Sequence, residues 1–118
     1  DPTRGGVAAV LNEIASASHV GVVIDEVTVP VAAEVRSACA LLGLDPMQVA
    51  DEGRLVAWVA GRDGERAVQV LRACTGGEQA VAIGHVVDEH PGMVVGRTAI
   101  GGTRIIDVPL GELLPRIC

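Results

Sequence analysis

The chain has 118 residues, 49% of them apolar, and a formal net charge of −6 at pH 7, which suits one domain with its own core. The acidic charge disfavours a phosphate-backbone partner, and Trp58, the single aromatic residue, provides no platform for stacking bases. No apolar run reaches the length of a membrane span and no signal peptide is visible, so neither nucleic acid nor a membrane is expected as a partner.

The first third of the chain predicts two helices around one strand. Thr3 is the expected N-cap of an amphipathic helix. Its apolar face is predicted from helical spacing as Val7, Val10, Leu11, Ile14 and Ala15. Residues 20–25 (VGVVID) predict a buried strand. Pro30 suits the first turn of a second helix, which Gly43 ends. The inward positions predicted for that helix are Val31, Val35, Ala38, Cys39 and Leu42.

The remainder of the chain predicts four strands and one further helix. Residues 54–60 (RLVAWVA) are apolar at alternate and intervening positions, which is typical of a central strand. A third helix is expected after Asp63, with Ala67, Val70, Leu71 and Cys74 inward. Three strands follow at residues 80–87, 93–99 and 103–108, joined by glycine-containing turns. The order predicts an α+β domain with a mixed β-sheet covered by helices.

The three cysteines show no CxxC spacing, so we expect reduced thiols and a cytoplasmic protein rather than a disulfide framework or a metal site. Cys39 and Cys74 are interpreted as small buried apolar residues. No packing argument applies to Cys118, the last residue. Residues 109–118 therefore predict a mobile arm that carries a thiol, although a frayed end remains the alternative. Because residue 1 is Asp, we expect the chain to be a piece of a longer protein.

Two segments are candidate binding or catalytic sites. Residues 3–6 (Thr3, Arg4, Gly5 and Gly6) place amides, a hydroxyl and a guanidinium at a helix N-terminus, where anions bind. The alternative is a tight turn that packs the helix. Glu52, which follows Asp51, is either part of a solvated turn or a general base, half-buried against the strand that follows.

Several motifs along the chain resemble the C-terminal domain of the HypE family of hydrogenase maturation proteins, within the aminoimidazole ribonucleotide synthetase superfamily. They are DPTRGG at residues 1–6, LNEIA at 11–15, CALLGLDPMQVADEGRLVAWV at 39–59, AIGHV at 82–86, HPGMVV at 90–95, RTAIGGTRIID at 97–107 and ELLPRIC at 112–118. The terminal PRIC together with TAIGGTRI is the most specific part. At Asp51 the chain departs from the family, which usually has Asn before Glu-Gly.

The resemblance implies a function in making the cyanide ligands of the nickel–iron hydrogenase active site. The partner HypF would carbamoylate Cys118, and ATP would then be used to dehydrate the thiocarboxamide to a thiocyanate, with Glu52 as the base. The nitrile would pass to iron on a HypC–HypD complex. The resemblance further implies that residues 3–6 contact phosphate.

The resemblance also implies an organisation in which residues 1–108 form the C-terminal domain and residues 109–118 the arm. An N-terminal domain, absent from this chain, would contain most of the binding site for ATP and Mg²⁺. The same domain would form the homodimer interface. The isolated piece would then lack full activity. Two alternatives stay open: another ATP-using enzyme of the superfamily, or a non-catalytic docking module.

Overall fold

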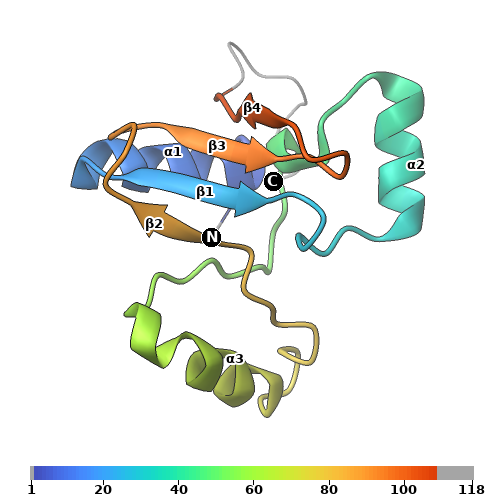
Figure 1. Ribbon diagram of the computed structural model, residues 1–118. Helices are drawn as coiled ribbons and strands as arrows, with labels where there is room; N and C mark the ends of the chain where they lie inside the picture. Colours follow the sequence, from blue (N-terminus) through green and yellow to red (C-terminus); the bar gives the residue numbers. More distant parts are fainter. Residues whose placement is uncertain (1, 109–118) are drawn as a thin grey trace.

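A computed structural model gives the fold and describes residues 2–108 (Figure 1). The described chain forms helices, short 3-10 helices and strands in the order α1 (Gly6–Ser18), β1 (Gly21–Asp25), α2 (Ala33–Leu42), η1 (Pro46–Gln48), η2 (Gly61–Asp63), α3 (Gly64–Arg72), β2 (Gly84–Val87), β3 (Val94–Arg97) and β4 (Thr103–Ile105). The predicted α+β class is confirmed. Among the described residues, no helix is both long and apolar enough to cross a membrane.

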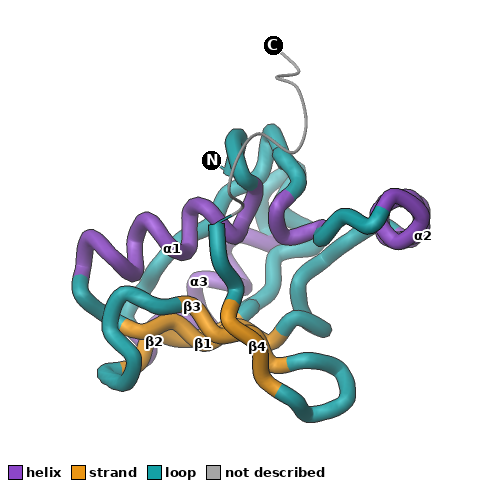
Figure 2. Tube along the Cα trace, turned by 90° about the horizontal axis from the view of Figure 1, so that it is seen from above, coloured by secondary structure: helices purple, strands orange, loops and turns teal. Residues whose placement is uncertain are grey.

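The four strands form one mixed sheet in the order β2-β1-β3-β4. The central pair β1 and β3 is parallel, and both edge strands are antiparallel to their neighbours. Helix α1 lies along one face of this sheet (Figure 2). Because side chains alternate across a strand, only every second position faces the helix. The core between the two layers contains Ala8, Leu11, Ala15, Val22, Ile24, Val29, Met47, Val94 and Ile106.

Helix α1 begins differently from the prediction. Its N-cap is Gly5, in the left-handed conformation at φ 66°, and no side chain caps the helix, so the prediction that Thr3 is the N-cap is wrong. The chain turns sharply here because Gly6 also has a positive φ, of 62°. The helix ends at His19, again left-handed, whose N–H caps the last turn.

Helices α2 and α3 lie outside the core, and the apolar faces predicted for them are largely exposed. In Figure 1, α2 stands beyond the ends of β1 and β3, and α3 beyond the edge strand β2. Cys39 is the buried residue of α2, as predicted, but Val35 and Leu42 are exposed. No residue of α3 is buried, and Cys74, predicted to face inward, is exposed. Helix α2 starts at Ala33, so Pro30 precedes it rather than forming its first turn.

The predicted central strand at residues 54–60 is wrong as a sheet element. The segment belongs to no strand, and residues 54–59 make no backbone hydrogen bond to another part of the described chain. Val56 and Trp58 pack against the core, whereas Leu55 and Val59 on the opposite face are 72% and 51% exposed. An apolar strand of this kind needs cover on both faces, and the described chain covers one.

Candidate functional site

The structure brings the two candidate segments into contact at the start of α1. The backbone N–H of Asp51 donates to the carbonyl of Pro2 at 3.0 Å. Pro2 is fully buried, so the chain is anchored immediately before Thr3 and Arg4. Residues 2–6 and the turn at Asp51 therefore form one surface, although half of the chain separates them in sequence.

Gly6 makes this contact possible. A Cβ on Gly6 would lie 2.6 Å from the carbonyl oxygen of Met47, and closer still to that of Val49. Only a residue without a side chain allows the backbone of η1 and its continuation to approach the helix so closely. The glycine therefore serves to pack α1 against η1, which agrees with the tight-turn interpretation. Thr3 and Arg4 are exposed beside it and available to an anion from solvent.

Glu52 lies in an exposed turn, so the expectation that it is half-buried is wrong. The physical reason is that the following residues do not enter the sheet and so provide no buried strand for it to lean against. Gly53 completes the turn with φ 74°. The neighbouring carboxylate of Asp51 pairs with Arg54, whose Nε lies 3.4 Å from Asp51 Oδ1.

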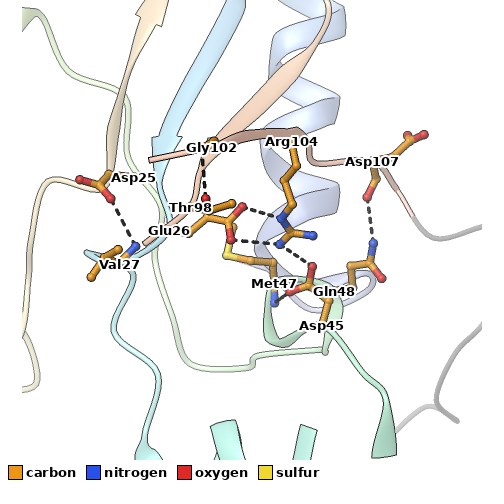
Figure 3. Close-up of polar contacts among 10 residues, drawn as sticks. All are labelled: Asp25, Glu26, Val27, Asp45, Met47, Gln48, Thr98, Gly102, Arg104 and Asp107. Carbon is orange, nitrogen blue, oxygen red and sulfur yellow. Dashed lines mark hydrogen bonds and ion pairs between the residues drawn. The ribbon is translucent and has the colours of Figure 1, made fainter. Parts of the chain in front are cut away.

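The last described residues run past the same place. Asn12 Nδ2 donates to the carbonyl of Ile106 at 2.8 Å. Gln48 Nε2 donates to the carbonyl of Asp107 at 3.2 Å (Figure 3). Residues 106–107 are thus held between α1 and η1, close to the turn at Asp51. Cys118 and the predicted arm at residues 109–118 lie outside the described residues. Cys118 follows Asp107 by eleven positions, so the thiol has a maximum reach of about 36 Å from this point.

A cluster of charges missed by the sequence analysis stands beside η1. Arg104 Nε lies 2.6 Å from Glu26 Oε1, and its Nη2 lies 2.7 Å from Asp45 Oδ2 (Figure 3). The hydrogen bond to Glu26, and secondly the interaction with Asp45, raise the pKa of Arg104 above its usual value. Gly96 leaves the space for Glu26, because a Cβ there would overlap the carboxylate. No local spacing signals this cluster, since its members come from three distant parts of the sequence.

A shallow pocket of about 260 Å³ lies elsewhere, over β1, β2 and β3, and none of the predicted site residues lines it. Its polar lining residues are Asp25, Thr28, His85 and Arg97. The candidate site is therefore a surface formed by residues 2–6, η1 and the turn at Asp51 rather than this pocket.

Comparison with known proteins gives the same family as the motifs. Residues 1–96 match the family described as AIR synthase related protein, C-terminal domain. A curated relative from Rhizobium leguminosarum bv. viciae, named carbamoyl dehydratase HypE, is 52% identical over all 118 residues, which cover 34% of its length. The chain spans about a third of the length of the curated relatives it matches.

Solved structures show the same fold. A crystal structure of the hydrogenase maturation protein HypE in complex with ATP matches with a TM-score of 0.92 and 42% identity, over 100% of this chain and 36% of that one. A HypE–HypF complex matches with a TM-score of 0.87 and 41% identity, over 92% of this chain and 35% of that one. The chain belongs to the AIR synthase related C-terminal domain family, in the form that HypE proteins carry.

Proposed function

We propose that the full-length protein is an ATP-dependent carbamoyl dehydratase of [NiFe]-hydrogenase maturation. Cys118 accepts a carbamoyl group, and the thiocarboxamide is dehydrated to a thiocyanate, the source of the cyanide ligands of the active-site iron. The observation that carries this proposal is a pair of hydrogen bonds close together in sequence: Gln48 donates to Asp107, and the N–H of Asp51, three residues later, donates to Pro2. The names of the curated relatives support it.

The described residues suit the parts that this chemistry needs. Amide oxygen is a poor leaving group. Transfer of a phosphoryl group from ATP converts this oxygen into part of a good leaving group, phosphate. One N–H proton is lost when ATP phosphorylates the oxygen, which leaves an imidate phosphate and ADP. Glu52, exposed in its turn, then takes the second N–H proton as the C–O bond breaks, phosphate departs and the C≡N bond forms. Thr3 and Arg4 are the side chains that would contact a phosphate, since both are exposed at the start of α1. Most of the ATP site, with Mg²⁺, lies on the N-terminal part that we expect to precede this chain.

The thiol of Cys118 must reach more than one partner protein in turn, and a mobile arm would allow this. We propose HypF as the carbamoyl donor, in keeping with the solved complex of HypE and HypF. The HypC–HypD complex is the proposed acceptor of the cyanide, and the full-length protein is expected to be a homodimer in the cytoplasm. The 118-residue chain alone is expected to be folded and inactive.

The test is mass spectrometry of the full-length protein after incubation with HypF, carbamoyl phosphate and ATP. We expect an adduct on Cys118 that loses water when ATP is present, and none in Cys118→Ala. Because Cys74 is exposed, Cys74→Ser serves as the matched control and should be modified like the wild type. An adduct that persists in Cys118→Ala contradicts the proposal. Absence of any adduct in the wild type favours another superfamily enzyme or a docking module.

A further inference from the structure

We propose that Arg104 is a positioning residue for the dehydration step, because it fixes the position of η1. Through η1 it also holds Asp107, which lies just before the predicted arm, and the turn that carries Glu52. This inference rests on the proposed function. The described ion pairs of Arg104 are with Glu26 and Asp45, and not with residues 2–6 or the turn at Asp51. Its role follows from what its two carboxylate partners hold.

Asp45 connects Arg104 to η1. One carboxylate oxygen, Oδ2, accepts from Arg104 at 2.7 Å, while the other, Oδ1, accepts from the backbone N–H of Met47 at 2.9 Å. Asp45 therefore caps η1 and ties it to β4 at the same time. Movement of this carboxylate would move the 3-10 turn with it.

Two contacts that matter for the site start from η1. Gln48 holds Asp107, eleven residues before the thiol. The carbonyls of Met47 and Val49 pack on Gly6, and the chain then reaches Asp51, whose N–H bonds to Pro2. A displacement of η1 would therefore disturb both the hold on Asp107 and the contact between the turn at Asp51 and residues 2–6.

The guanidinium is committed to the protein rather than available to a phosphate. Its Nε and Nη2 bind Glu26 in a fork, at 2.6 and 3.3 Å, and Nη2 also binds Asp45. With two carboxylates around one cation the cluster carries a net charge of −1, which repels an incoming anion. Both carboxylate side chains are only 21% exposed, so each needs its partner.

Arg104→Met should therefore leave Glu26 and Asp45 facing each other unpaired and push η1 away. We expect carbamoylation of Cys118 by HypF to stay at the wild-type rate, because the arm itself is unchanged. Dehydration should slow about tenfold or more, since misplacement of reacting groups by about 1 Å can cost up to 100-fold. Arg62→Met is the matched control, because Arg62 is 88% exposed and, among the described residues, forms an ion pair with its neighbour Asp63.

A neutral triple variant separates positioning from direct participation. In Arg104→Met with Glu26→Gln and Asp45→Asn, the repulsion is gone, and Asn still caps the turn. Dehydration should return to within about threefold of the wild type, as expected for a group that acts only by neutralising two carboxylates. A triple variant as slow as Arg104→Met alone would overturn the positioning role.

Hydrogen exchange in the full-length protein gives a readout that does not depend on turnover. The amides of Met47 and Asp51 should exchange faster in Arg104→Met and recover in the triple variant, because Met47 donates to Asp45, the partner of Arg104, and Asp51 donates to Pro2 just beyond η1. Unchanged exchange at both amides would overturn the inference even if the wild type makes no thiocyanate. If Arg104→Met does not fold, Arg104→Gln replaces it, since a neutral amide can still hydrogen-bond the carboxylates but supplies no positive charge to them. Wild-type dehydration by Arg104→Gln would equally contradict the proposal.

Discussion

Replacing Gly6 by alanine tests the packing that brings the candidate segments together. The left-handed conformation at φ 62° costs a residue with a side chain about 1–2 kcal/mol. The new Cβ would also lie 2.6 Å from the carbonyl oxygen of Met47, so the backbone must shift, which costs about 1–3 kcal/mol more. We expect Gly6→Ala to lower the free energy of unfolding by about 2–5 kcal/mol in total.

Urea unfolding of the 118-residue chain, followed by the fluorescence of Trp58, measures this loss, because Trp58 is the only Trp and packs against the core. Gly43→Ala is the matched control. Gly43 has a φ of 68°, close to that of Gly6, and a Cβ there would meet nothing within 4 Å. The control should cost only about 1–2 kcal/mol. Equal losses at Gly6 and Gly43 would refute the close approach of η1 to α1 and favour an anion-binding role for the glycine.

Three further outcomes are expected. The Glu52→Gln protein should still accept carbamoyl on Cys118 but dehydrate it about 100-fold more slowly, whereas the Asp51→Asn protein should stay active. Single-turnover formation of thiocyanate measures both rates. A near wild-type rate for Glu52→Gln would remove Glu52 from the mechanism. Leu11→Ala should cost about 3–5 kcal/mol in urea unfolding because Leu11 is 2% exposed, and a loss below about 1 kcal/mol would contradict its place in the core. Cys39→Ser should cost about 1–3 kcal/mol and exposed Cys74→Ser less than about 0.5, with equal losses arguing against the difference in burial.

The elements around the core were predictable because their signals are local. The apolar side chains of β1 must be buried on at least one face of the sheet. Helix α1 covers that face, and Val22 and Ile24 pack in the core beneath it. The turn glycines at Gly92 and Gly101 have the positive φ values that end strands. Helical spacing likewise located α1, although a sequence pattern could not show that Gly5, in the left-handed conformation, rather than Thr3 precedes the helix as its N-cap.

The errors about which side chains are buried share one physical cause. Periodicity reports which side chains need burial, and not whether the same chain provides it. Leu55, Val59 and Leu42 were expected inside for this reason, and they lie exposed where the described chain has nothing to cover them. The cluster around Arg104 was missed because an ion pair between residues 78 positions apart leaves no spacing to recognise.

The candidate site was predictable as two separate segments and not as one surface. Residue types at the start of α1 and at Glu52 were enough to nominate each segment. Their contact depends on the bond from Asp51 to Pro2 and on the missing side chain of Gly6, which are properties of the folded backbone. The exposure of Glu52 follows from the same long-range packing, which the sequence of the turn does not encode.

The unpaired stretch after Arg54 has a practical consequence for handling the chain by itself. Residues 55–60 (LVAWVA) contain no charge, glycine or proline, and such segments pair readily between chains and start aggregation. Arg54 and Arg62 flank the stretch as gatekeepers, the charges that natural sequences place beside unavoidable apolar strands. Solubility of the 118-residue chain should therefore fall when either arginine is neutralised and rise when exposed Leu55 is replaced by Lys.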